Sequence, residues 1–329
     1  MTAILFSVIL IALVFEFING FHDTANAIAT SVYTRAMTAG KAIMLAASMN
    51  FLGALVSEHV AKTITSGLVG IEIEEYVILA ALAGAIAWNL ITWWRGIPSS
   101  SSHALIAALV GATIVYTMGL EGILWKGVLA KVVIPLFTSP LLGFFLGFGV
   151  MKLIFQTCQK YSPGRINNVF TKLQIISAAS VAFSHGTNDS QKTMGIITLT
   201  LISADVLPGD SGVPLWVKIM CAITIAIGTS IGGWKIMKTM GVGVTKLQPP
   251  GGFAAQTSAA AVIWFMSLLG APISTTHVIT SSVMGVGSAR RLSAVRWSKA
   301  KDIVFAWVIT LPICAVLGGI ACWIIGFVI

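Results

Sequence analysis

Charged side chains are scarce in this sequence. Only 9% of its 329 residues are Asp, Glu, Lys or Arg, whereas soluble globular domains carry roughly a quarter. The mean hydropathy is +0.93, and 57% of the residues are hydrophobic. With so few charges the chain cannot cover the surface of a soluble globule with polar groups. The composition therefore excludes a soluble protein and predicts one that is embedded in a lipid bilayer.

Cysteine and the common catalytic motifs are also sparse. The chain has four cysteines, and none has the CxxC spacing of a metal or redox site. The helical HExxH motif of zinc hydrolases is absent, and so is a Ser-His-Asp spacing. We therefore expect no enzymatic activity, no bound metal and no cofactor. An intramembrane hydrolase with a metal at His22 and Asp23 is the alternative from the enzyme class.

Long apolar runs occupy most of the chain. A helix needs about 20 apolar residues to cross the core of a bilayer. The predicted spans are 3–20, 39–57, 76–94, 102–119, 132–152, 173–203 with a polar interruption, 215–233, 253–270, 274–289 and 302–328. The sequence thus predicts an all-α integral membrane protein with about ten transmembrane helices.

Positive charge is concentrated on one side of the predicted membrane. The formal net charge is +9, and one alternating set of loops holds most of the Lys and Arg residues with a single acid, Asp302. The other set holds acids. By the positive-inside rule the basic side is cytoplasmic, so both termini are expected on the outer side of a cell inner membrane. The membrane topology thus accounts for the positive net charge, and no nucleic-acid partner is expected.

Two motifs occur once in each half of the chain. GIPSSSSHAL at 96–105 returns as GAPISTTHVI at 270–279, and NGFHDTANA at 19–27 returns as HGTNDSQKT at 185–193. Each half holds five predicted crossings, so equivalent segments run in opposite directions, as in many secondary transporters. The predicted organisation is a first inverted repeat at 1–155, a cytoplasmic basic loop at 156–172 and a second inverted repeat at 173–329. Broken or re-entrant helices are expected at the motifs.

The hydroxyl motifs combine a helix breaker with helix caps. Pro98 and Pro272 are expected to interrupt the preceding helix, and Ser or Thr residues that follow are good N-caps. A helix begun there aims backbone N–H groups and its positive dipole end at one point, which favours an anion. The hydroxyls add neutral donors for a tetrahedral oxyanion. The candidate anion ligands are Ser100, Ser101, Ser102, Ser274, Thr275 and Thr276.

Ionisable residues inside membrane segments are candidates for function, because burying a charge is costly. Asp23 and Asp189 are repeated, and a carboxylate beside a bound anion needs a cation or proton between them. Lys192 could neutralise Asp189 or attract the anion, while Asn26 at the aligned position could offer an amide to the ligand. Glu16 could serve as a ligand or pair with a nearby donor.

Two further pairs belong to the motifs. His103 and His277 lie at the tips of the predicted half-helices, where they could contact the ligand or hold the helix by bonding a backbone carbonyl. Gly20 and Gly186 precede the repeated acids and are expected to permit unusual backbone angles beside them.

With these motifs the chain resembles the PiT family of inorganic phosphate transporters. Members carry two inverted copies of a Gly-Ala-Asn-Asp-type signature and Pro-x-Ser-x-x-His segments. GTND at 186–189 follows the signature, and GFHDTANA at 20–27 is similar to that of bacterial low-affinity permeases. The resemblance covers the whole chain and implies a symporter that imports phosphate. It implies that Asp23, Asn26, Asp189 and the six hydroxyls surround phosphate and its coupling cation, with Lys192 beside them.

The coupling ion is left open by the motifs. His22 stands where sodium-coupled members typically have Asn, and imidazole is a poor sodium ligand that titrates near neutrality. This favours proton coupling, with phosphate free or as a divalent metal complex. Asn188 in the other copy keeps sodium as an alternative, and sulfate stays open as substrate.

An anion channel is the alternative from another class of protein, and it would need the same hydrogen-bond donors but no coupling acid. A GxxxG spacing at 143–149 allows a homodimer.

Overall fold

The structure is a computed structural model that describes residues 3–231 and 245–328, with the backbone alone described at 24–26. Every regular element in this part of the chain is a helix, and one isolated bridge joins Val69 to Ile123. The predicted all-α class is therefore confirmed.

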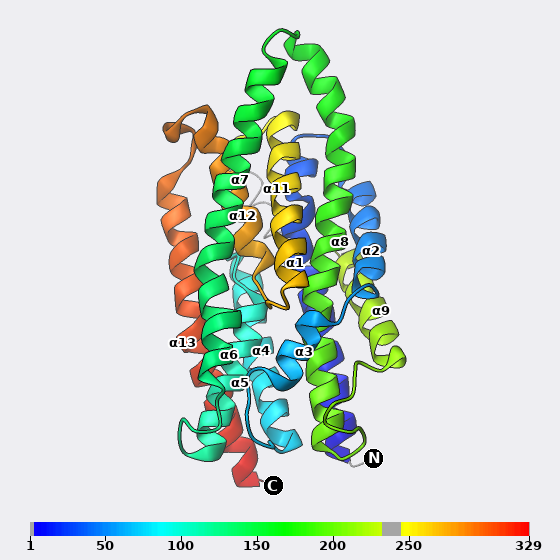
Figure 1. The fold of residues 1–329 in the computed structure, drawn as a ribbon, viewed down its shortest axis with the longest axis vertical. Coiled ribbons are helices and arrows are strands. Elements are labelled where there is room, and N and C mark those ends of the chain that lie inside the picture. Colours follow the sequence, from blue (N-terminus) through cyan, green and yellow to red (C-terminus); the bar gives the residue numbers. More distant parts are fainter. Residues whose placement is uncertain (1–2, 232–244, 329) are drawn as a thin grey trace.

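The helices follow one another with short connections (Figure 1). The first half contains α1 (Ala3–Tyr33), α2 (Ala39–Ala54), α3 (His59–Ser66), α4 (Glu75–Arg95), α5 (Ser101–Thr117), α6 (Trp125–Val128), the π-helical turn η1 (Leu129–Val133) and α7 (Ile134–Cys158). The second half contains α8 (Pro163–Ser203), α9 (Leu215–Ile231), α11 (Pro249–Leu268), α12 (Thr275–Arg290), the 3-10 turn η2 (Leu292–Ala294) and α13 (Trp297–Val328).

Several helices can cross a bilayer. Within residues 3–231 and 245–328, four stretches are long and apolar enough to do so alone: α1, α4, the continuous run Trp125–Cys158, and α13. The pair α2 and α3, bent by 64°, makes a fifth candidate, while α5 and α9 are apolar but shorter. The end of the predicted span 215–233 lies outside the described residues. A multi-span protein is thus supported, and the number of ten stays a prediction.

Two helical hairpins reach the middle of the bundle from opposite ends (Figure 1). The α4–α5 hairpin comes from the end where both termini lie, and the α11–α12 hairpin comes from the other end. At their tips Gly96 and Gly270 have φ of 67° and 70°, in the left-handed region that glycine adopts without strain. Each helix therefore ends before or at the glycine, and Pro98 and Pro272 lie in the extended segment that follows.

The aspartate motifs lie in unbroken helices. Helix α1 has 31 residues and α8 has 41, and both continue through their motif without a break. The broken helices predicted at these two motifs are therefore wrong, and the polar interruption in the apolar run 173–203 lies within a continuous helix. The expected interruption exists only at the hydroxyl motifs.

The motif glycines serve packing instead of unusual backbone angles. A Cβ on Gly20 would lie 2.6 Å from the carbonyl oxygen of Ile225 in α9, and one on Gly186 would lie 2.3 Å from that of Asn50 in α2. Both glycines are helical, so the sequence-based interpretation of their role is wrong. They allow α1 to approach α9, and α8 to approach α2, at backbone contact.

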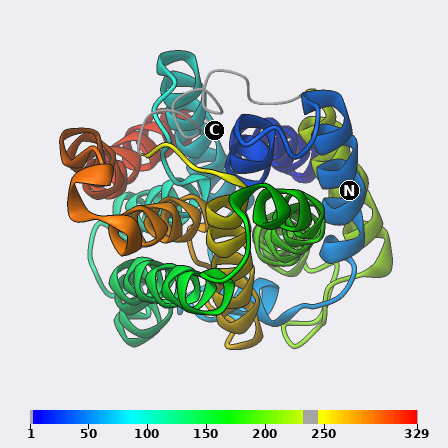
Figure 2. The ribbon, with the colours of Figure 1, turned by 90° about the horizontal axis from the view of Figure 1, so that it is seen from above.

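The two halves interlock through further glycines. In α5, a Cβ on Gly111 would lie 1.9 Å from the carbonyl oxygen of Ala315 in α13, and in α12 one on Gly285 would lie 2.0 Å from that of Phe144 in α7. The second arm of each hairpin thus packs on the last long helix of the other half. Figure 2 shows the bundle from above, with α13 on one side and α2 and α9 on the other.

The GxxxG face of α7 is used inside the chain. A Cβ on Gly143 would lie 2.8 Å from the carbonyl oxygen of Val278, and one on Gly147 would lie 2.6 Å from that of Ser282. Both contacts are with α12. Because this face is covered by the chain's own helix, the sequence argument for a homodimer no longer holds.

The segment 156–172 is mostly helical. Helix α7 runs to Cys158 and α8 begins at Pro163, so the connection is only residues 159–162. The predicted basic loop is therefore a helical hairpin with a short turn. It projects from the end of the molecule opposite the termini (Figure 1), because 41 helical residues extend about 60 Å and the core of a bilayer is about 30 Å thick.

Candidate functional site

The hairpin tips are capped as the sequence predicts. The hydroxyl oxygen of Ser100 accepts a hydrogen bond from the backbone N–H of His103 at 3.1 Å, and that of Ser274 accepts one from His277 N–H at 3.3 Å. The two tips also touch, since Ser102 Oγ donates to the carbonyl oxygen of Ile273 at 3.0 Å. The starts of α5 and α12 therefore meet inside the protein, where their positive dipole ends converge.

Asp23 lies on α1 and receives a hydroxyl from each tip. Ser101 Oγ lies 2.6 Å from its Oδ2, and Thr276 Oγ1 lies 3.2 Å from its Oδ1. The Nδ1 atom of the neighbouring His22 lies 2.8 Å from Oδ1. Ser101 also lies 2.8 Å from Asn19 Oδ1. The carboxylate is buried, so hydroxyl and imidazole groups replace water around it.

Asp189 lies on α8 and has an equivalent but more charged set of partners. Thr275 Oγ1 donates to its Oδ2 at 3.2 Å, and His185 Nε2 lies 3.1 Å from the same oxygen. The ammonium of Lys192 pairs with its Oδ1. That ammonium also donates to Ser102 Oγ at the tip before α5 and to the backbone oxygen of Ile273 at the tip before α12. Lys192 therefore neutralises Asp189, and a role in attracting an anion stays a prediction.

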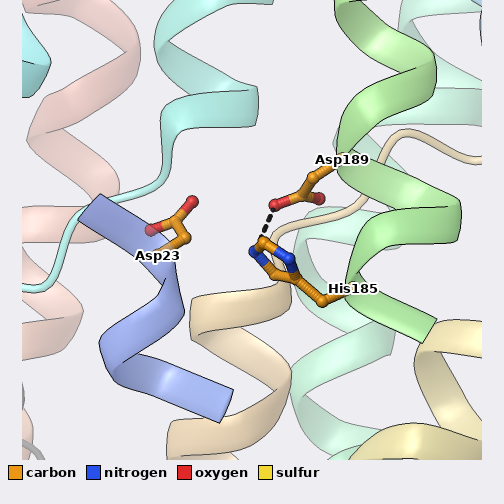
Figure 3. A group of neighbouring side chains, drawn as sticks. All are labelled: Asp23, His185 and Asp189. Atoms are coloured by element: carbon orange, nitrogen blue, oxygen red, sulfur yellow. Dashed lines mark ion pairs between the residues drawn. The ribbon is translucent and has the colours of Figure 1, made fainter. Parts of the chain in front are cut away.

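The two acids approach one another across the halves of the molecule (Figure 3). One ligand atom from each of Asp23, His185 and Asp189 lies within 4.8 Å of the other two. Asp23 reaches this point from α1, while His185 and Asp189 reach it from α8 (Figure 3). All three are buried. The predicted convergence of both aspartates and both hydroxyl clusters on one place is therefore what the fold produces.

Each histidine beside an acid is held by its other ring nitrogen. Nδ1 of His185 lies 3.1 Å from Asn50 Oδ1, and Asn50 Nδ2 donates to Thr229 Oγ1 at 2.9 Å. Nε2 of His22 lies 3.2 Å from Thr92 Oγ1. That hydroxyl is 3.0 Å from its own helix carbonyl at Trp88 and is approached at 2.9 Å by Ser99 Oγ. These neighbours fix the orientation of both imidazole rings.

The remaining predicted ligands lie differently. The carboxylate of Glu16 accepts hydrogen bonds from Ser190 and Thr193 of α8, so its contacts in the described part of the chain are structural pairings. Asn188 Nδ2 donates to Ser267 Oγ at 2.8 Å and to Ala271 O at 3.2 Å. The side chain of Asn26 lies outside what the structure describes.

The tip histidines do not bond backbone carbonyls. Within the described part of the chain, His103 Nδ1 and both ring nitrogens of His277 have no hydrogen-bond partner. The two rings lie 4.9 Å apart between centroids, and His277 stacks on Trp307 at 3.9 Å. The described contacts of these rings are with each other and with Trp307, and contact with the ligand stays a prediction.

Several site residues escaped the sequence analysis. His185 stood in the repeated motif without an assigned role, although its position four residues before Asp189 puts both on one helix face. Asn50 and Thr92 lie in apolar runs and are buried. A polar side chain in a predicted membrane span is itself a signal, because it needs a partner in hydrocarbon.

Comparison with known proteins agrees with this geometry. The family described as "Phosphate transporter family" matches residues 19–318 of the chain. The chain belongs to the phosphate transporter family. A "Probable low-affinity inorganic phosphate transporter" of Bacillus subtilis (strain 168) is 48% identical over 327 residues, which cover 98% of this chain and 97% of that protein. A protein of the same description from Rhizobium meliloti (strain 1021) is 46% identical, covering 96% and 95%.

The fold is also shared with a solved structure. A structure described as "The sodium-dependent phosphate transporter" superposes with a TM-score of 0.90 and 27% identity, covering 100% of both chains. The PiT resemblance is thus confirmed. This phosphate transporter family member is a multi-pass membrane protein and a transporter, not an enzyme.

Proposed function

We propose that this protein is a secondary active symporter that imports inorganic phosphate, free or as a divalent metal complex, driven by the proton gradient. The observation that carries the proposal is the sharing of hydroxyl donors between the tips and the acids. Ser101 and Thr276 contact Asp23, and Thr275 contacts Asp189. A tetrahedral oxyanion at the tips needs these same donors.

Competition for the hydroxyls links the anion to a proton. While the acids are ionised, they draw the hydroxyl protons and repel an approaching phosphate. A proton or other cation at Asp23 and Asp189 removes both effects, so the hydroxyls can turn to the anion. The dipole ends of α5 and α12 then complete the binding site. Phosphate and the coupling ion therefore bind together.

The histidines favour protons as the coupling ion. With Asn50 Nδ2 donating to Thr229, Asn50 Oδ1 accepts from His185 Nδ1, and this leaves His185 Nε2 facing Asp189 Oδ2 at 3.1 Å, close enough for a proton to pass between them. His22 is arranged in a similar way, since its Nε2 lies against Thr92 Oγ1 and its Nδ1 faces Asp23 Oδ1. Each acid thus has an imidazole with which it shares an exchangeable proton.

We further propose ten crossings in two inverted repeats, 1–155 and 173–329, with both termini on the outer side. The opposed hairpins and the exchanged packing of α5 on α13 and α12 on α7 support this arrangement. The basic residues of the α7–α8 hairpin favour a cytoplasmic location for that end by the positive-inside rule. Alternating access then exposes the central site to one side at a time.

Uptake of radioactive phosphate into proteoliposomes tests the proposal. With sodium absent and the membrane potential clamped, an imposed inward proton gradient is expected to drive accumulation. Asp23→Asn serves as the control and is expected to abolish accumulation while the protein elutes as the wild type. Accumulation driven by a sodium gradient at equal pH, with none driven by protons, would overturn the proton assignment. Equal inhibition of uptake by sulfate and by unlabelled phosphate would overturn the assignment of phosphate as the substrate.

Sodium coupling is the second candidate, and two observations favour it. Asn188 Oδ1 is buried with no hydrogen-bond partner in the described part of the chain, and an amide oxygen is a suitable sodium ligand. The solved structure with TM-score 0.90 is described as sodium-dependent. In the same assay Asn188→Leu would remove sodium-driven uptake and leave proton-driven uptake in place.

A further inference from the structure

A cavity separate from the central site lies at the end of the molecule that carries the α7–α8 turn. It has a volume of about 630 Å³ and is lined by the end of α7, the starts of α8 and α11, and the end of α12 with the turn η2. None of the residues of the central site lines it. The transport mechanism makes no use of it.

The polar wall of this cavity is basic. Lys246, Arg290, Arg291 and Arg296 line it, and no Asp or Glu does so among the residues that the structure describes. All four side chains are exposed. A cation in the last turn of a helix is favoured by the helix dipole, which accounts for Arg290 at the end of α12. The positive-inside rule accounts for basic residues at this end of the molecule, but four of them line one cavity without an acid among its described lining residues, and this convergence suits an anionic ligand.

Two helix N-termini add to the positive field. Pro163 at the start of α8 lines the cavity, and so do Gln248 and Gly251 at the start of α11. Neither N-cap side chain, Ser162 or Gln248, makes a capping hydrogen bond. Pro163, Pro249 and Pro250 carry no backbone N–H, so Gly251 is the first N–H donor of α11, and the contribution of these two helix starts is mainly their positive dipole ends.

The opposite wall is apolar and continues to the outer surface. Met151, Ile154 and Phe155 of α7 line the cavity together with Val286 of α12. Phe155 is 41% exposed, and its neighbour Leu153 is 58% exposed on the outside of α7. A free phosphate ion has no use for such a wall. A ligand with a charged head and a hydrocarbon tail satisfies both walls.

We propose that this cavity binds the phosphate headgroup of an anionic membrane lipid, with its acyl chains along the outer face of α7. Basic pockets between transmembrane helices are suited to such headgroups, because the phosphate gains charge-assisted hydrogen bonds while the chains stay in hydrocarbon. The bound lipid bridges the α7–α8 and α11–α12 hairpins. The inference is independent of the transported ion and of the coupling ion.

Lipid titration of the purified full chain tests the proposal. Native mass spectrometry would measure binding of phosphatidylglycerol, with phosphatidylcholine as the neutral probe. Wild type is expected to prefer phosphatidylglycerol. Arg290→Gln with Arg291→Gln is expected to weaken its binding about 30-fold, since each basic residue near an anionic headgroup contributes about 1 kcal/mol. The charge-conserving pair Arg290→Lys with Arg291→Lys is expected to retain it.

A matched control separates the cavity from general charge. Lys160→Gln with Lys301→Gln removes the same charge from the same end without touching the cavity lining. This variant is expected to bind as the wild type, and elution volumes show that each variant is folded. Equal phosphatidylglycerol binding by the two glutamine pairs would overturn the proposal. Displacement of the lipid by millimolar inorganic phosphate would also overturn it, because the cavity would then be a site for the free ion.

Discussion

The two halves of the molecule hold their aspartates in matching places but with different charges nearby. Asp23 meets Ser101 of its own half and Thr276 of the other, with His22 alongside. Asp189 meets Thr275 of its own half, and the ammonium of Lys192 connects it to Ser102 of the other. The aligned position in the first half is the neutral residue Asn26.

This difference shows how a duplicated frame can host unequal sites. The capped tips and their hydroxyls contact the two acids in a similar way in both halves, as the proposed alternating access would require. The ionisable groups depart from this similarity, because one acid pairs with an ammonium inside the protein. Asp189 lies beside Lys192, whereas Asp23 has hydroxyls and a histidine as its described neighbours.

The largest expected effect concerns stability. Asp189→Asn leaves the buried Lys192 without its counter-ion, and breaking a buried pair costs about 3–5 kcal/mol. Asp23→Asn is expected to cost less, because hydroxyls and an imidazole can also bond an amide. Thermal unfolding in detergent measures both. The double change Asp189→Asn with Lys192→Met should recover most of the loss, and equal midpoints for the two single variants would contradict the difference between the halves.

The glycine contacts should be equivalent in the two halves. Gly111→Ala and Gly285→Ala each place a Cβ against the backbone of the opposing helix, so each is expected to destabilise by about 1–3 kcal/mol. Gly149→Ala is the control, since nothing lies within 4 Å of its Cβ position. It should be neutral or slightly stabilising. A loss at only one of the first two positions would show that the packing is less symmetric than the backbone indicates.

The helix caps are the next matched pair. Ser100→Ala and Ser274→Ala each remove one N-cap hydrogen bond and are expected to cost about 1 kcal/mol, whereas Ser→Gly at either position costs only a few tenths. Urea or thermal unfolding of the four variants measures this. If alanine and glycine cost the same, the hydroxyls do not act as caps in solution.

The smallest expected effect separates the two histidines. His185→Asn should lower the ratio of initial uptake rates at pH 6 and pH 8 by about threefold, because imidazole is the side chain that exchanges a proton in this range. His22→Asn should change the ratio less, since His185 and not His22 lies within 4.8 Å of both acids. Initial uptake rates of both variants, measured between pH 6 and pH 8, test this expectation. A larger change with His22→Asn would assign the proton to the first half.

The amino-acid sequence by itself determined the class, the helical segments and the tips. Hydropathy determines which segments are buried in the bilayer, and a serine N-cap bonds a backbone N–H three residues away. Both features depend on residues that are close in the sequence, so they can be predicted from it. The repeated motifs also pointed to Asp23 and Asp189, because an acid in an apolar span is rare.

Only the tertiary structure decided how the polar residues are satisfied. Helices α1 and α8 stay unbroken through their motifs because groups such as Glu16 find hydroxyls on the neighbouring helix. Likewise Gly20 and the GxxxG face are filled by helices distant in the sequence, and His185 joins the acids only because α8 lies beside α1. These contacts depend on how segments far apart pack together, and local propensity carries no information about that.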